Sequence, residues 1–94
     1  MLKVIKFDWD QWNLQKNETK HGVSTLEAES VFFDPNYVLF LDEKHSSKFE
    51  NRYIIFGKSS EHRVLMIGFT LRYGRVRIIT ARSASKKERI IYEG

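Results

Sequence analysis

Hydrophobic and polar residues alternate with a period of two over much of the chain, a pattern typical of β-strands. A short first strand is predicted over residues 2–7. Four further runs are rich in β-branched or aromatic residues and are separated by polar turns. They cover residues 37–41, 52–56, 64–71 and 75–80. The link before the last run contains Gly74, which can supply positive φ, so a tight hairpin is expected there.

Between the first strand and the later ones, residues typical of helix caps and helix ends predict two helices. Asp10 is expected to cap a helix over residues 11–20, which Gly22 ends. Ser24 and Glu27 have the spacing of a capping box, which opens the second helix. That helix is expected to end before the Asp34-Pro35 step, because a residue that precedes proline disfavours helical geometry. The apolar residues that it would bury are Ala28, Val31 and Phe32.

A third helix is expected near the end of the chain, because residues 85–88 repeat the capping-box spacing. The order of elements is then a strand, two helices, a four-stranded antiparallel meander and a short C-terminal helix. This order predicts an α+β domain with its helices on one side of a mostly antiparallel sheet. The length of 94 residues fits one domain that spans residues 1–94.

The composition excludes several classes of protein and site. There is no cysteine, which excludes disulfides, zinc sites built on thiolates and a thiol nucleophile. No apolar run approaches the ~18 residues of a membrane-spanning helix, and the charged N-terminus does not resemble a signal peptide. We therefore expect a cytoplasmic protein without a membrane partner. The sequence contains no phosphate-binding or dinucleotide-binding glycine motif and no paired metal ligands, so neither a cofactor nor a metal is expected.

The net charge of +4 is unevenly distributed along the chain. Residues 1–49 carry six lysines and eight carboxylates, whereas residues 50–94 carry ten cationic side chains and four carboxylates. All seven arginines lie in that second part. The planar guanidinium matches phosphate oxygens in pairs, so this half favours a polyanion such as nucleic acid. The alternative is that arginines on surface strands only maintain solubility.

Strand alternation indicates which of these arginines share a face of the sheet. Arg75 and Arg77 would point one way, and Arg82 would point the other way with Ile78 if the pairing stays regular. Arg82 also precedes the predicted N-terminus of the last helix, where backbone N–H groups favour anions. With Ser83, Ser85 and Lys86 it could bind a phosphate. The alternative is that Ser85 caps the helix and Lys86 is only solvated.

Several blocks of residues together resemble the BrnT toxin family. Near the N-terminus they are Phe7-Asp8-Trp9-Asp10, Asn17, Lys20–Ser24 (KHGVS), Glu27-Ala28 and Val31–Pro35. In the second half they are Arg52-Tyr53-Ile54 with Gly57, Arg63-Val64-Leu65, Arg77–Ala84 (RIITARSA), Lys86–Arg89 and Tyr92-Glu93. The resemblance covers nearly the whole chain.

The resemblance implies a fold, an activity and a partner. The family is the toxin half of type II toxin–antitoxin pairs, and its fold is similar to that of the RelE ribonucleases. The implied activity is RNA cleavage that inhibits translation. The implied partner is a BrnA-type antitoxin with a ribbon-helix-helix domain, which binds operator DNA as a toxin–antitoxin complex. Two departures put activity in question: Asn13 stands where the family usually has lysine, and Ser83 where it often has a second arginine.

Metal-independent cleavage of RNA by its own 2′-hydroxyl needs groups that stabilise phosphorane charge, and arginine suits this task. Proton transfer needs a side chain such as His or Glu. Stacking on an aromatic ring can hold a base. The predicted catalytic residues are Arg52, Arg63, Arg77, Arg82, His21 and Glu50, and the predicted RNA-binding residues are Tyr73, Arg75, Ser85 and Lys86.

Some of the candidates also have a structural alternative. His21 could cap the C-terminus of the first helix, and Glu50 could form an ordinary surface ion pair. Trp9 and Trp12 are expected to pack in the core rather than stack on bases. The whole chain could also be a non-catalytic basic module, a decayed toxin that binds DNA together with its antitoxin.

Overall fold

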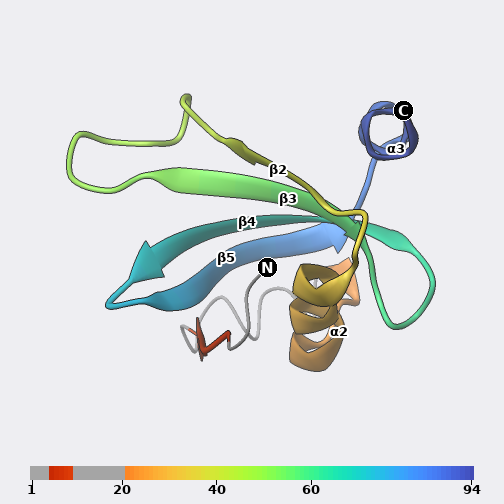
Figure 1. The fold of residues 1–94 in the computed structure, drawn as a ribbon, viewed down its shortest axis with the longest axis horizontal. Helices are drawn as coiled ribbons and strands as arrows, with labels where there is room; N and C mark the ends of the chain where they lie inside the picture. Colours follow the sequence, from red (N-terminus) through yellow and green to blue (C-terminus); the bar gives the residue numbers. More distant parts are fainter. Residues whose placement is uncertain (1–4, 10–20) are drawn as a thin grey trace.

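The fold is a five-stranded mixed sheet with a helix on each side (Figure 1). It is seen in a computed structural model that describes residues 5–9 and 21–94. The strands are β1 (Phe7–Trp9), β2 (Val38–Leu41), β3 (Arg52–Lys58), β4 (Val64–Arg72) and β5 (Arg75–Ser83). The helices are α2 (Thr25–Ser30), its 3-10 continuation η2 (Val31–Phe33) and α3 (Lys86–Glu93).

The strand order is β1-β5-β4-β3-β2, so β1 and β2 are the two edges of the sheet. The four later strands form the predicted antiparallel meander, and β1 pairs with β5 in parallel. The first strand was expected over residues 2–7, but the structure places it at Phe7–Trp9. The predicted helix over residues 11–20 and its cap Asp10 lie outside the described residues.

The main core lies between the sheet and α2 with η2. Phe32 of η2 meets Phe7 and Phe69 edge-on, with ring centroids 5.3 and 5.1 Å apart. The sheet residues of this core alternate along β3 and β4, as in Tyr53 and Ile55 and in Leu65, Ile67 and Phe69. We call this side of the sheet the α2 face. Gly57 belongs to it because a Cβ there would lie 2.7 Å from Cγ1 of Val31, so only glycine lets η2 pack this closely.

The pairing of β4 with β5 contains a β-bulge. Gly68 pairs with Thr80 and Phe69 pairs with Ile78, so the residue between Ile78 and Thr80 has no partner opposite it. The extra residue reverses the alternation, and Ala81 rather than Thr80 returns to the α2 face. Arg82 therefore lies on the face that carries Arg75 and Arg77. The expectation that Arg82 points the other way is wrong, because the pairing is not regular.

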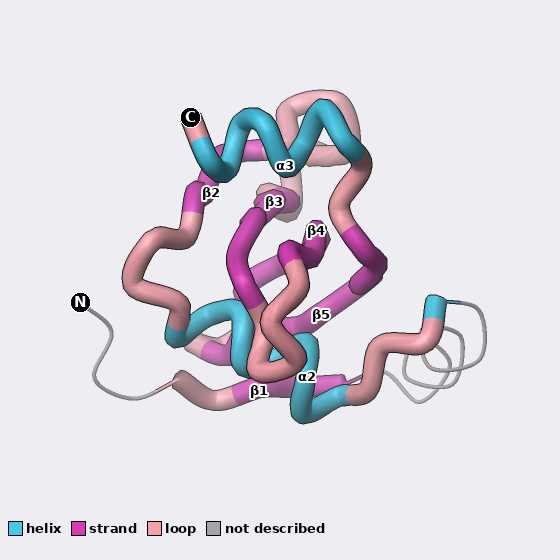
Figure 2. Tube along the Cα trace, turned by 90° about the vertical axis from the view of Figure 1, so that its right-hand side faces the viewer, coloured by secondary structure: helices cyan, strands magenta, loops and turns pink. Residues whose placement is uncertain are grey.

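The C-terminal helix α3 lies on the other side of the sheet from α2 (Figure 2). The predicted capping box is present: Ser85 Oγ accepts from the Glu88 backbone N–H, and Glu88 accepts from the Ser85 N–H. The Tyr92 hydroxyl donates to Asp34 Oδ2 at 2.6 Å, which ties the helix to the residue after η2. The expectation that the helices share one side of the sheet does not hold for α3.

Candidate functional site

A row of polar side chains crosses four adjacent strands on the face opposite α2. Asp8 of β1 pairs with Arg77 of β5, Arg77 pairs with Thr70 of β4, and Thr70 pairs with Arg52 of β3. Arg52 and Arg77 are separated by two strand spacings, so their Cα atoms are about 10 Å apart. Arg77 Nη1 lies 3.2 Å from Asp8 Oδ2. The register of the sheet thus places two guanidinium groups on either side of one hydroxyl.

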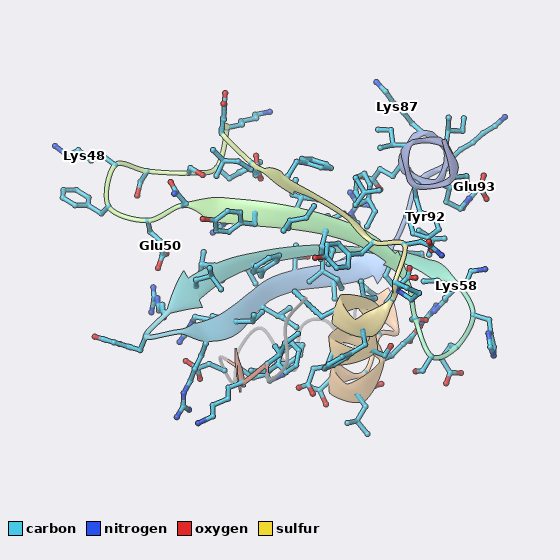
Figure 3. All side chains as sticks on the ribbon, viewed as in Figure 1. Lys48, Glu50, Lys58, Lys87, Tyr92 and Glu93 are labelled. Carbon is cyan, nitrogen blue, oxygen red and sulfur yellow. The ribbon has the colours of Figure 1, made fainter. Side chains whose placement is uncertain are left out.

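The hairpin at the end of β4 and β5 adds two more arginines to this face. Arg72 and Arg75 pair with each other on either side of the two-residue turn. Arg72 Nε donates to Glu50 Oε2 at 2.9 Å, and Glu50 precedes β3 (Figure 3). We call the set Arg52, Arg72, Arg75 and Arg77 the arginine cluster.

Three arginines of the cluster, Arg52, Arg72 and Arg77, interact electrostatically with the Glu50 carboxylate. The hydrogen bond from Arg72 lowers the pKa of the Glu50 carboxyl below its usual 4.5, and the charges of Arg52 and Arg77 lower this pKa further. Glu50 is therefore an ionised carboxylate at neutral pH. It can accept a proton from a substrate hydroxyl that is bound beside these arginines.

Two buried polar atoms in the same row have no hydrogen-bond partner among the residues that the structure describes. They are Arg52 Nε and Thr70 Oγ1, which face the same side of neighbouring strands. Buried donors are almost always satisfied in folded proteins, so such groups are completed by water or a ligand, or they mark strain or function. Their position between β3 and β4 makes the Arg52–Thr70 step the centre of the candidate site.

A polar hollow of about 580 Å³ opens beside the arginine cluster, between the β2–β3 loop and the β4–β5 hairpin. The hollow is lined by Ser47, Phe49, Glu50, Arg72 and Tyr73. Tyr73 is fully exposed and Phe49 is 87% exposed. Tyr73 was a predicted RNA-binding residue. Phe49 was not predicted, although an aromatic residue between Lys48 and Glu50 in a polar loop is a visible signal in the sequence.

Arg63 lies at the other end of the sheet and faces α2. Its Nε and Nη2 both donate to the Glu27 carboxylate at 2.6 Å, and Nη2 also donates to the Gly22 carbonyl. Glu27 is 5% exposed and also accepts from Ser59 Oγ. These bonds lower the pKa of Glu27, with the Arg63 hydrogen bond as the largest cause. Arg63 thus joins α2 to the β3–β4 turn and does not meet the arginine cluster.

Arg82 is also held by a carboxylate, on the α3 side. Its Nη1 and Nη2 donate to the two oxygens of Glu88 at 2.8 and 2.9 Å. The same carboxylate accepts from the Ser85 backbone N–H, so it occupies the place that was predicted for a phosphate. Lys86, the first residue of α3, is exposed. Arg82 and Ser85 therefore build the start of α3 in this structure.

His21 lies near Arg63 rather than near the arginine cluster. Its neighbour Gly22 accepts the Arg63 hydrogen bond at the β3–β4 turn, whereas Glu50 and Arg72 lie by the β4–β5 hairpin. The nine residues of β4 separate the two ends by about 27 Å. Of the predicted catalytic residues, Arg52, Arg77 and Glu50 are thus the ones brought together, whereas Arg63 and His21 lie on the α2 side and Arg82 lies beside α3.

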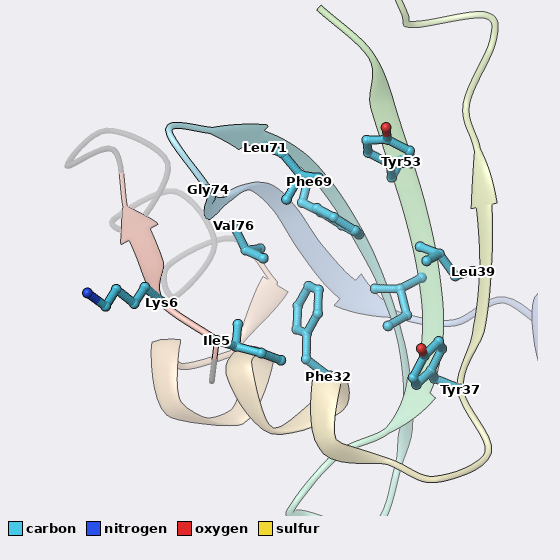
Figure 4. A pocket seen from close by; sticks show the side chains of 11 residues that line it. Ile5, Lys6, Phe32, Tyr37, Leu39, Tyr53, Phe69, Leu71, Gly74 and Val76 are labelled. Carbon is cyan, nitrogen blue, oxygen red and sulfur yellow. The ribbon is translucent and has the colours of Figure 1, made fainter. Parts of the chain in front are cut away.

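An apolar cavity of about 390 Å³ lies on the α2 face, close to the main core (Figure 4). Its walls include Ile5, Phe32, Tyr37, Tyr53 and Leu71, and among the described residues of its lining only Lys6 is charged. Tyr53 stacks on Phe69 there, with ring centroids 5.5 Å apart. Hydrophobic walls offer little to a phosphate, so we do not place RNA chemistry in this cavity.

Other sequence expectations concern the core, metals and membranes. Trp9 packs against the core as expected, and its Nε1 donates to Glu29 Oε2 at 2.7 Å, whereas Trp12 lies outside the described residues. Within residues 5–9 and 21–94, no three His, Cys, Asp or Glu side chains gather in a way that could hold a metal. No helix in the same ranges is long and apolar enough to cross a membrane.

Comparison with known protein families gives a match over most of the chain. The model of the family described as "Ribonuclease toxin, BrnT, of type II toxin-antitoxin system" matches residues 9–88. The chain belongs to this family. Its members are ribonuclease toxins, and a type II system pairs such a toxin with a protein antitoxin. No curated protein matches the chain.

A solved structure shows that the fold is also that of a BrnT protein. The crystal structure of the ribonuclease toxin BrnT from Brucella abortus aligns with a TM-score of 0.63 and 23% sequence identity. The alignment covers 88% of this chain and 100% of the Brucella chain. The BrnT resemblance that the sequence motifs indicated is therefore confirmed at the level of family and fold.

Proposed function

We propose that this BrnT-family chain cleaves RNA without a metal ion, at the arginine cluster. The supporting observation is the row of Arg77, Thr70 and Arg52 on adjacent strands, together with Glu50, whose carboxylate accepts from Arg72 and whose pKa is lowered by the charges of Arg52 and Arg77 as well. The chemistry would resemble that of RelE ribonucleases in its use of the substrate's own 2′-hydroxyl. Arg63, Arg82, His21, Ser85 and Lys86 have no direct part in the step as we propose it.

The proposed reaction is an internal transesterification, in which the 2′-oxygen of the RNA replaces the 5′-oxygen on the same phosphorus. Glu50 takes the proton of the 2′-hydroxyl, whose oxygen forms a bond to the adjacent phosphorus. The bond from phosphorus to the 5′-oxygen breaks, and solvent at this exposed face protonates the leaving oxygen. Arg52 and Arg77 donate to the equatorial phosphorane oxygens, where charge develops. The products are a 2′,3′-cyclic phosphate and a 5′-hydroxyl.

Purified protein and end-labelled RNA test this proposal, in the presence of a metal chelator. Arg52→Lys and Arg77→Lys keep the charge but lose the guanidinium fork, and each is expected to lower the cleavage rate by about 10²–10³-fold. Arg89→Lys is the matched control, because Arg89 lies on α3 and donates to the Ala84 carbonyl. Full activity of both cluster variants would refute the assignment. Intact RNA with soluble wild-type protein would refute the ribonuclease proposal.

The alternative function is a basic module that binds nucleic acid without cutting it. It is favoured by Arg63 and Arg82, two predicted catalytic arginines that are held by carboxylates. Salt-dependent RNA binding with no cleavage at enzyme excess would support this alternative.

For the partner, we propose a BrnA-type antitoxin with a ribbon-helix-helix domain, which binds operator DNA together with the toxin. Co-expression with the protein of the neighbouring small gene tests this. A stable complex that no longer cleaves RNA is expected, and separate elution of the two proteins would contradict it.

A further inference from the structure

The hollow beside the arginine cluster is lined by two aromatic side chains that are exposed to solvent and bury little surface in the fold. Tyr73 and Phe49 are among the most exposed large side chains of the described residues. Lys48 Nζ lies 5.1 Å from the centroid of the Phe49 ring, so one face of that ring carries a cation. The hollow that the two aromatics line has a volume of about 580 Å³, which is enough to admit a flat heterocycle. Exposed aromatics beside a basic surface are the groups on which unpaired bases stack.

Tyr73 also has an unfavourable backbone conformation. Its φ is 51° and that of Gly74 is 74°, and Arg72 pairs with Arg75, so the hairpin closes with a two-residue turn that needs positive φ at both central positions. Asn or Gly is favoured at the first of these positions, and a bulky aromatic residue is disfavoured. A fully exposed tyrosine in this conformation weakens the hairpin without burying any surface. Contact with a ligand gives a reason for tyrosine at this position.

Arg72 supplies a hydrogen-bonding group to the lining of the same hollow. Glu50 accepts from its Nε and so fixes the plane of the guanidinium. Within the described residues, neither terminal nitrogen of Arg72 has a hydrogen-bond partner. These two nitrogens form a fork of parallel donors. Such a fork matches the O6 and N7 acceptors of guanine, the most common specific contact between arginine and a base.

We propose that this hollow binds one unstacked guanine of the RNA substrate. The base stacks on Tyr73 and Phe49, and the terminal nitrogens of Arg72 donate to its O6 and N7. Adenine presents an amino group in place of O6, and the pyrimidines have no N7, so the fork selects guanine. The proposal rests on the proposed ribonuclease function, since it gives the cleaving site a base preference next to Arg52 and Arg77.

Binding of RNA that cannot be cleaved tests this subsite separately from catalysis. Short 2′-O-methyl oligonucleotides of uridine lack the attacking hydroxyl, and the central base can be guanine, adenine or 7-deazaguanine. Fluorescence anisotropy with the full chain should show guanine bound about 5- to 150-fold more tightly than adenine. The 7-deaza base lacks one of the two acceptors and should lie between them.

Variants of the hollow show which residues carry the preference. Arg72→Lys keeps the charge but loses the fork, so the ratio between guanine and adenine should fall close to one. Arg89→Lys is the matched control, because Arg89 lies on α3 and donates to the Ala84 carbonyl, and it should leave this ratio unchanged. Tyr73→Asn suits the turn, so the hairpin is retained while guanine affinity falls about 5- to 150-fold.

Equal binding of guanine and adenine by the wild-type protein would overturn the proposal. So would a guanine preference that survives both Arg72→Lys and Tyr73→Asn. These failures are distinct from failure of the ribonuclease function. A protein that prefers guanine but leaves unmodified RNA intact would support the guanine subsite and refute the ribonuclease proposal. A protein that cleaves RNA without any base preference would support the ribonuclease proposal and refute the subsite.

Discussion

Replacement of Arg63 by alanine is expected to destabilise the fold rather than to remove a catalytic group. Glu27 is 5% exposed, and Arg63 supplies two of its hydrogen bonds and its counter-charge. Removal of one partner of a fully buried ion pair costs about 3–5 kcal/mol. The Arg63 side chain is 40% exposed, so water can partly replace it, and we expect a loss of about 2–3 kcal/mol. For a domain of this size that loss lowers the melting temperature by about 10–20 °C.

The pH dependence of the loss identifies its cause. In the wild-type protein the pKa of Glu27 is lowered, so its stabilising effect is present above the unfolded pKa and disappears as the pH falls through the folded pKa. In Arg63→Ala, burial without the counter-charge favours protonated Glu27. The deficit is therefore largest at neutral pH and shrinks below the usual value of 4.5.

Thermal unfolding followed by circular dichroism at several pH values measures both effects. The double variant Arg63→Ala with Glu27→Gln is the control, because it leaves no buried charge, and it should be more stable than Arg63→Ala alone at neutral pH. A melting temperature that stays within a few degrees of wild type would refute the reasoning. Loss of RNA cleavage at unchanged stability would instead return Arg63 to the catalytic site.

Three further outcomes follow from contacts elsewhere in the molecule. Gly57→Ala should cost about 1–3 kcal/mol in chemical denaturation, because its Cβ would lie 2.7 Å from a Val31 methyl group. Tyr92→Phe removes the hydrogen bond to the Asp34 carboxylate and should lower the free energy of unfolding by about 1–2 kcal/mol, measured in the same way. If Glu50 is the proton acceptor, the rate of RNA cleavage should stay level across neutral pH and fall only below 4.5, since the pKa of Glu50 is lowered. An acidic limb near 6.5 would indicate a histidine instead.

The sequence allowed the meander, the second helix, the final capping box and the hairpin to be predicted, because each depends on local periodicity or on residues close in the chain. The parallel pairing of β1 with β5 could not be predicted, since nothing local specifies a partner almost seventy positions away. The bulge between Ile78 and Thr80 was missed for a similar reason. It depends on how β4 and β5 are matched along their whole length, and it alone decides the face of Arg82.

The sequence indicated which types of residue the candidate site needs, but not which of these residues lie together in the structure. Arginine counts and spacing do not reveal which carboxylate each side chain meets, and Glu27 and Glu88 were assigned only to capping boxes. In the structure Glu88 completes its box, while the Glu27 carboxylate binds Arg63 and Ser59. Of the four arginines predicted to be catalytic, Arg52 and Arg77 share a row of the sheet, while Arg63 and Arg82 do not join it.

The geometry of each carboxylate contact separates structural arginines from those that can bind a phosphate. Arg63 and Arg82 each place two nitrogens on one glutamate, and a phosphate would have to displace both bonds together with the packing of α2 or α3. Arg72 gives Glu50 only its Nε, and the pair lies at a partly exposed hollow where water already screens it. Arg52 Nε has no acceptor among the described residues, but it is buried, so a phosphate oxygen would reach it only after a local rearrangement of the side chain. We therefore expect RNA to bind at the hairpin end of the sheet rather than at the end where Glu27 and Glu88 each hold an arginine by two nitrogens.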